Sequence, residues 1–290
     1  MARANDEVAA LAERLGDPFQ VARRWLWATW IAMHDGRFVE ALDGIGHLRG
    51  ALEGIGEPVQ KALADFGDAF LDVWQGQPER PLEGLQRRLE RTLKLGAGLG
   101  VPWLLWATAF AELATGRPER ARGQLEGLVQ LVEGRESFLT SYALGLLAET
   151  RRLLSDDAAD AAALEAQANG EQLGNRLLAT RPRLTLGRLA AARGDWTAAQ
   201  QHALAHLDAC AEGGHATYVP SCLDALAEVA AGQGSHRDAV RLLAAADCAR
   251  AEIGAVRVPP EEEHWAAIEG RLRKTLAPPP TRPRVPRAPS

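Results

Sequence analysis

Apolar residues recur along most of this chain at the three- and four-residue spacing of amphipathic helices, and glycines and prolines interrupt the pattern. One set of glycines falls about forty residues apart, and a second set lies roughly midway between its members. The first set is Gly36, Gly76, Gly116, Gly194 and Gly234, and the second is Gly16, Gly56, Gly96, Gly134, Gly174, Gly214 and Gly254. A period of this size is typical of stacked supersecondary units, so the sequence predicts an array of helical hairpins.

Each unit is predicted to hold two helices, the first ending at a glycine of the first set and the second at a glycine of the second set. Residues 23–34 and 37–55 illustrate the pair. Glycine suits both positions because it adopts the left-handed conformation that closes a helix. The fourth unit has Ser155 near the expected glycine. Pro182 falls inside a first helix, which either starts late with Thr180 as its cap or is kinked.

Small residues recur at two fixed positions around the first-set glycines, which lets paired helices approach closely. Seven residues before the glycine stand Thr29, Ala69, Ala109, Glu149, Gly187 and Ala227, and five after it stand Ala41, Pro81, Ala121, Ala161, Ala199 and Ala239. This arrangement resembles the tetratricopeptide repeat, although the period exceeds the usual length of about 34 residues. The resemblance implies an all-α, tetratricopeptide-like, right-handed α-solenoid of about six helical hairpins.

The array is expected to occupy residues 1–277 as one solenoid, because each repeat contacts mainly its neighbours. Its units are placed near 17–56, 57–97, 98–135, 136–174, 175–214 and 215–254. An unpaired helix over 7–15 is predicted before them. A capping helix over 259–276 is predicted after them, with acids at its start and bases at its end, as the helix dipole favours. The Pro- and Arg-rich tail 278–290 is expected to be disordered.

The stretch 239–263 contains Arg-Leu-Leu-Ala-Ala-Ala-Asp over 241–247 and then Ile253-Gly254 and a double proline. Together with Leu-Gly-Arg-Leu-Ala over 186–190, it resembles the C-terminal repeats of large ATP-binding bacterial transcription regulators of the LuxR type. The resemblance implies a part in a regulator's sensing or assembly region. In that family a nucleotide-binding module precedes the repeats and a helix-turn-helix often follows, but this sequence has no GxxxxGKS or GxxxxGKT motif, and the tail after 277 is too short for a helix-turn-helix.

The formal net charge of −5 gives no electrostatic signature of nucleic-acid binding, so no direct contact with nucleic acid is expected. Three cysteines without a CxxC pair favour reduced thiols. The N-terminus lacks an apolar signal core, and no run of eighteen apolar residues occurs. A cytoplasmic protein without a membrane segment is therefore predicted.

Catalytic motifs such as HExxH and GxSxG are absent from the sequence, so neither an enzyme nor a cofactor is predicted. His202, His206 and Cys210 share one face of a second helix at four-residue spacing, with His215 beyond them. These are zinc-ligand types. However, His206 also occupies a helix–helix contact position, where a neighbouring group can satisfy it, so no metal site is predicted.

First helices line the concave groove of tetratricopeptide-like solenoids, and the groove positions lie at fixed offsets before each first-set glycine. In the first three units they are mostly aromatic, and later they become polar. The resulting candidates are Trp30, Phe66, Phe70, Trp74, Trp103, Trp106, Phe110, Arg181 and Arg188. Aromatic residues dominate many binding hot spots. They also pack as core in a tightly wound array, and the sequence leaves both interpretations open.

The function predicted from these features is a non-catalytic module that binds a protein or peptide segment, or a small-molecule effector, in its concave groove. By resemblance it would serve a LuxR-type regulator. A freestanding scaffold for protein assembly is the alternative. A helical enzyme acting on an apolar substrate is a third possibility, but the aromatic units offer no acid paired with a base.

Overall fold

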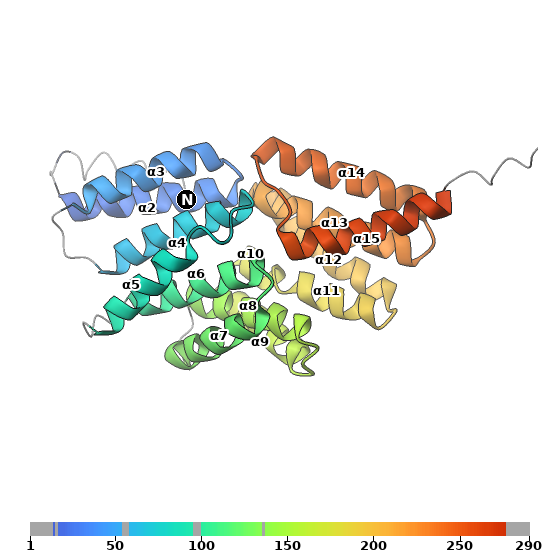
Figure 1. Cartoon of the computed structure of the whole chain (residues 1–290), viewed down its shortest axis with the longest axis horizontal. Helices are drawn as coiled ribbons and strands as arrows, with labels where there is room; N and C mark the ends of the chain where they lie inside the picture. Colours follow the sequence, from blue (N-terminus) through green and yellow to red (C-terminus); the bar gives the residue numbers. More distant parts are fainter. Residues whose placement is uncertain (1–13, 15–16, 54–57, 95–99, 135–136, 277–290) are drawn as a thin grey trace, which may run out of the picture.

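The computed structural model describes residue 14 and residues 17–53, 58–94, 100–134 and 137–276, and these residues form helices and turns without a strand. The helices pair in chain order along a curved array (Figure 1). They are α2 (Pro18–His34), α3 (Phe38–Ala51), α4 (Pro58–Trp74), α5 (Leu82–Lys94), α6 (Val101–Ala114), α7 (Pro118–Val132), α8 (Phe138–Leu153), α9 (Ala159–Gln172), α10 (Arg176–Thr180), α11 (Arg183–Ala192), α12 (Trp196–Gly213), η2 (Ala216–Tyr218), α13 (Val219–Gly232), α14 (His236–Ile253) and α15 (Pro259–Leu276). The predicted helix over 7–15 and the tail 278–290 lie outside the described residues.

The glycines that punctuate the sequence occupy the turns between helices. All five first-set glycines have positive φ, as do Gly134, Gly174, Gly214 and Gly254. Among the described non-glycine residues, Ser155 alone has positive φ, at 55°. The fourth unit therefore keeps the left-handed turn although its glycine is missing, at a cost of about 1–2 kcal/mol.

The fifth unit has a broken first helix. α10 ends at Thr180 and α11 begins at Arg183, with Pro182 at the position before α11. Of the two alternatives that the sequence left open, a late start and a kink, the structure agrees with the kink, since Arg181 and Pro182 keep helical backbone angles between α10 and α11. Thr180 does not cap α11, whose N-cap residue is Pro182 without a side-chain hydrogen bond.

The segment after α14 closes the array on itself. Figure 1 shows the first hairpin, α2 and α3, facing the last, α13 and α14, across the top of the molecule. Residues 253–260 pass across the turns that follow α2, α4 and α6: Ile253 lies at Gly36, Val256 at Gly76 and Pro260 at Gly116. The amide of Val256 donates to the carbonyl of Trp74 at 2.8 Å.

This closure places the inward-facing side chains of the first three units in a continuous core. Phe66, Phe70 and Trp106 are each 1% exposed. Phe66 lies 4.8 Å from Trp106 between ring centroids, and Trp106 lies 5.0 Å from Phe110. Large buried rings of this kind contribute several kcal/mol each to the free energy of folding.

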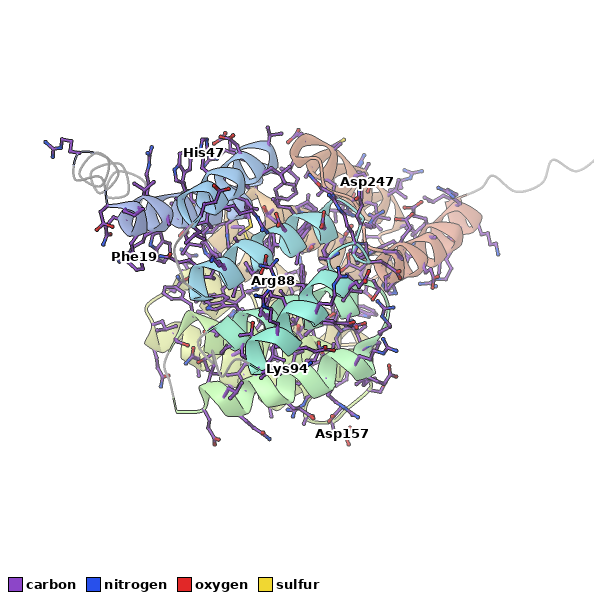
Figure 2. The ribbon with its side chains drawn as sticks, turned by 60° about the vertical axis from the view of Figure 1, so that its left-hand side comes forward. Phe19, His47, Arg88, Lys94, Asp157 and Asp247 are labelled. Carbon is purple, nitrogen blue, oxygen red and sulfur yellow. The ribbon has the colours of Figure 1, made fainter. Side chains whose placement is uncertain are left out.

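Ion pairs fasten neighbouring helices, within a hairpin and between hairpins, on the outside of this core. Arg88 of α5 lies over α4 in Figure 2, and its Nε is 2.9 Å from Oδ2 of the buried Asp65. Arg49 of α3 contacts the other carboxylate oxygen at 3.1 Å. Burial nevertheless raises the pKa of Asp65 to about 6, against the opposing effect of the two guanidinium groups.

The last helix covers the exposed end of the final hairpin. Trp265, Ile268 and Leu272 of α15 are buried against apolar residues of α13 and α14. Within the described part of the chain, no helix combines the length and apolar character needed to span a membrane.

Candidate binding pocket

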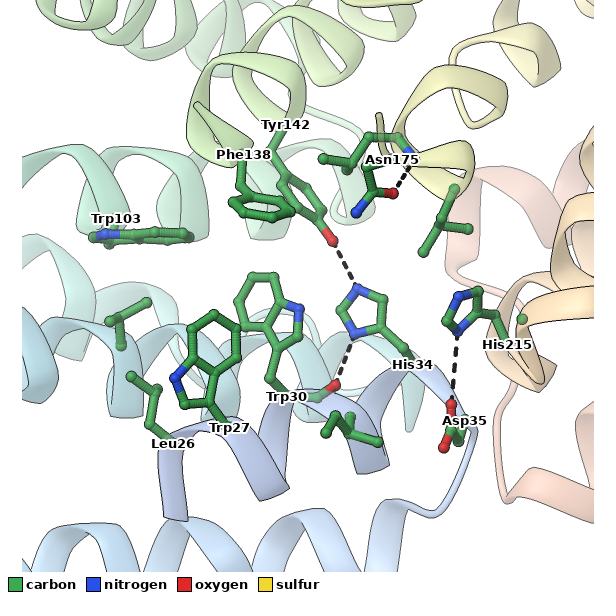
Figure 3. Close-up of a pocket in the computed structure, with 15 residues that line it drawn as sticks. Leu26, Trp27, Trp30, His34, Asp35, Trp103, Phe138, Tyr142, Asn175 and His215 are labelled. Atoms are coloured by element: carbon green, nitrogen blue, oxygen red, sulfur yellow. Dashed lines mark hydrogen bonds and ion pairs between the residues drawn. The ribbon is translucent and has the colours of Figure 1, made fainter. Parts of the chain in front are cut away.

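A cavity of about 610 Å³ lies between α2 on one side and α8 and α10 on the other (Figure 3). Most of its lining comes from the first helices of successive units. The lining residues are Leu26, Trp27, Trp30, Ile31, His34, Asp35, Leu63, Trp103, Phe138, Tyr142, Asn175, Leu177 and Leu178, with Gly213 and His215 from the end of α12 and the turn after it. This volume is within the range of ligand pockets, about 300–1,000 Å³.

Aromatic rings form most of the apolar wall. Trp30 is central: its ring stacks on Phe66 at 5.2 Å and meets Trp103 and Tyr142 edge-on at 5.9 and 5.6 Å between centroids. Trp27 and Phe138 remain 38% and 46% exposed. The wall therefore combines rings fixed by the core with rings whose faces are accessible to a ligand.

His34 forms a rigid part of the wall. Its Nδ1 lies 2.8 Å from the carbonyl of Trp30, which can only accept, so Nδ1 carries the proton. Its Nε2 therefore accepts from the hydroxyl of Tyr142 at 2.6 Å. Burial lowers the pKa of His34 to about 3, and burial raises the pKa of Tyr142 well above its usual value. Both side chains are neutral at physiological pH and hold each other in place.

Polar groups gather at one end of the cavity. Asn175 caps α10 by accepting from the amide of Leu178 at 3.0 Å, and this leaves its side-chain amide to donate into the cavity (Figure 3). Beside it, Nδ1 of His215 lies 3.6 Å from Oδ1 of Asp35. A ligand in this cavity would meet rings along most of its length and hydrogen-bonding groups at one end.

The structure brings two of the residues predicted from the sequence, Trp30 and Trp103, to this cavity. The other five aromatic candidates lie in or against the core. Phe66, Phe70 and Trp106 are buried, and Trp74 and Phe110 pack against them. These five side chains therefore pack as core, which is one of the two interpretations that the sequence left open.

The two predicted arginines contact protein groups. The guanidinium of Arg181 lies over the rings of Tyr142 and Tyr218, at 4.7 and 5.4 Å from their centroids. Arg188 pairs with Glu149 at 2.6 Å and with Glu261 of α15 at 3.4 Å. Both arginines thereby connect elements that are distant in sequence.

Sequence reasoning missed several residues that shape the cavity. His34 lies four residues after Trp30 on the same helix face, so helical spacing alone could have found it. Tyr142 belongs to the fourth unit, which the groove projection left out. Asn175 and His215 reach the cavity through the break at Pro182 and the turn after α12, and no periodic signal marks them.

No protein-family model matches the chain, and no curated protein matches it in sequence. Among solved structures, the Rap protein complexed with Competence and Sporulation Factor aligns over 94% of this chain and 81% of its own, with a TM-score of 0.59 and 14% identity. BtubC (BKLC) from P. vanneervenii aligns over 100% and 95%, with a TM-score of 0.47 and 16% identity. The likeness to Rap confirms the predicted class of fold, an all-α tetratricopeptide-like solenoid.

Proposed function

We propose that this chain is a non-catalytic binding module that takes an apolar segment of a protein partner into the cavity between α2, α8 and α10. The observation that carries the proposal is the aromatic wall of the cavity, with partly exposed rings at Trp27 and Phe138. Large aromatic side chains in concave sites supply much of the energy of protein association. Rap was solved in complex with Competence and Sporulation Factor, which gives a precedent for ligand binding by a solenoid of this class.

The lining defines the chemistry of the partner. One or two large apolar side chains would pack against the exposed faces of Trp27 and Phe138, and a carbonyl or carboxylate oxygen would accept from Asn175. A small-molecule effector with an apolar body and one polar end is the second candidate, since the cavity volume of about 610 Å³ suits such a ligand.

Catalysis is a weaker candidate because the cavity offers poor acid–base chemistry. His34 is held neutral, and its second nitrogen is already engaged by Tyr142. The remaining pair, Asp35 and His215, lies at one end of the cavity with each group facing the other. A general base needs a free lone pair within reach of its substrate.

The wider role that we propose is in a cytoplasmic regulator of the LuxR type. Binding in the cavity would change the pitch of the solenoid, and this conformational change would be transmitted to a neighbouring domain or partner. The support is the resemblance of 186–190 and 239–263 to the repeats of that family. A freestanding scaffold is the alternative. An adjacent ATPase or helix-turn-helix reading frame in the genome would favour the regulator.

The test compares two tryptophans of one helix. Trp27 lines the cavity, whereas Trp25 stacks on His47 of α3 with ring centroids 4.1 Å apart. Partners are captured from native lysate with the unmodified chain, with Trp27→Ala and with Trp25→Ala. We expect Trp27→Ala to weaken binding of the captured partner by about 30-fold, the effect of a hot spot of about 2 kcal/mol.

The Trp25→Ala variant controls for general effects of removing a ring from α2. It should keep the affinity of the unmodified chain. Equal affinities for the two variants would contradict the proposed site, provided that both give the helical circular-dichroism spectrum of the unmodified protein.

A further inference from the structure

Two cysteines and a histidine converge in the interior between α12 and α13. His206 and Cys210 lie one turn apart on α12, and Cys222 lies on α13. A ring nitrogen of His206 and the two Sγ atoms all lie within 4.8 Å of one another, and the three residues are 0%, 1% and 0% exposed. The cluster adjoins Leu177 and Tyr218, so it lies behind the wall of the binding cavity and is separate from it.

The spacing of His206 and Cys210 is visible in the sequence, but the third member is not. His202, which shares their helix face in the sequence pattern, lies instead beside α11, where a Cβ added at Gly187 would be 3.3 Å from the Cβ of His202. His215 faces Asp35 at the cavity. Cys222 takes the third position because α12 and α13 pack side by side after the turn at Gly214.

A neighbouring hydroxyl fixes the tautomer of His206. The hydroxyl of Thr180 donates to the carbonyl of Arg176 at 2.9 Å, so its lone pair accepts from Nδ1 of His206 at 3.1 Å. The proton therefore resides on Nδ1, and the free lone pair of Nε2 is directed at Sγ of Cys210, 3.8 Å away. Metal-binding histidines are commonly oriented by such a bond at the second nitrogen.

We propose that His206, Cys210 and Cys222 bind a thiophilic d¹⁰ cation, either Cu(I) or Zn(II). With metal–sulfur and metal–nitrogen bonds of about 2.3 and 2.0 Å at a tetrahedral angle, ligand sulfur and nitrogen atoms lie about 3.5 Å apart. The 3.8 Å separation of Cys210 and His206 fits this value. Soft thiolates with one imidazole suit both ions: Cu(I) is satisfied by these three ligands, and Zn(II) requires a fourth from outside the set.

The test measures binding of each ion to the full chain under reducing, oxygen-free conditions. Zn(II) is titrated in competition with a chromophoric chelator, and Cu(I) in competition with bicinchoninate. Because the ligands are buried, the ion is added both to native protein and during refolding. We expect one equivalent of one of the two ions per chain. If the ion is Cu(I), thiolate-to-metal charge-transfer absorption should accompany binding. If it is Zn(II), the same kind of absorption should appear when Co(II) is bound as its spectroscopic substitute.

Three variants locate the bound ion. Cys222→Ala should abolish stoichiometric binding, while Cys248→Ala, which removes the exposed cysteine of α14, should leave it unchanged. Thr180→Val removes the bond to Nδ1 and should weaken affinity about 10- to 100-fold at unchanged stoichiometry. This loss of affinity separates a positioning role of Thr180 from a merely structural one.

A thermal measurement keeps the outcome decisive if a variant is less stable. An ion that binds only the native state raises the melting temperature of the unmodified chain. This rise should vanish in Cys222→Ala. The proposal is overturned if neither ion binds stoichiometrically, or if binding survives Cys222→Ala. The cluster would then be ordinary core.

Discussion

Replacing Gly76 by alanine tests whether residues 253–260 hold the array closed. Gly76 and Gly194 occupy equivalent turns, with φ of 79° and 77°. A Cβ at Gly76 would lie 2.5 Å from Cγ2 of Val256, whereas a Cβ at Gly194 would meet nothing within 4 Å. The two alanine substitutions therefore introduce the same backbone strain. Only the one at Gly76 also disturbs a contact with the segment that closes the solenoid.

The expected losses follow from these distances. The left-handed conformation costs alanine about 1–2 kcal/mol at either position. Overpacking against Val256 adds about 1–3 kcal/mol at Gly76 alone. The backbone of Val256 cannot withdraw without breaking its hydrogen bond to Trp74, which measures 2.8 Å. Gly76→Ala should therefore destabilise the chain more than Gly194→Ala.

The assay is denaturant unfolding followed by circular dichroism, with the double variant Gly76→Ala/Val256→Ala included. Removing the branched side chain of Val256 should restore most of the extra loss. Equal destabilisation by the two single variants, with no recovery in the double variant, would refute the closure.

Three further outcomes are expected from unfolding measurements. Ser155→Gly should stabilise the chain by about 1 kcal/mol because it relieves a positive φ, whereas Ser235→Gly, at φ −81°, should not stabilise it. Trp106→Ala should lower the free energy of unfolding by about 3–5 kcal/mol, because the ring is 1% exposed and its Nε1 donates to the carbonyl of Tyr142 at 3.1 Å. A loss below about 1 kcal/mol would contradict core packing. Burial, assisted by nearby Arg181 and His215, lowers the pKa of His34 from 6.5 to about 3, so between these values the unfolded state binds a proton that the native state does not. Stability should then fall by about 1.4 kcal/mol per pH unit below pH 6 from this group, and His34→Gln should remove that part of the slope.

Local features of the fold were accessible from the sequence because each depends on residues close along the chain. The glycines at forty-residue intervals marked the helix ends, and the structure shows positive φ at each first-set position. Ser155 occupies the same conformation without the matching residue, which shows that the turn is imposed by the packing of α8 on α9.

The cavity and the cluster of His206, Cys210 and Cys222 were harder to predict from the sequence, because both depend on contacts between different units. Periodicity identified Trp30 and Phe70 as equivalent inward-facing positions, yet one lines the cavity and the other is core. The difference arises from the neighbouring helices, because α4 packs between α2 and α6, whereas α2 belongs to the first unit. Cys222 likewise joins His206 only through the packing of α13 on α12.

The most direct test of the cavity as the partner-binding site is photo-crosslinking from α2. A benzoylphenylalanine is introduced in place of Trp27 in one variant and of Trp25 in another, and each is irradiated with the captured partner. Residue 27 lines the cavity and residue 25 stacks on α3. We predict a crosslink to the partner from position 27 and none from position 25. A crosslink from position 25 alone would place the partner on the outer face and contradict the proposed function.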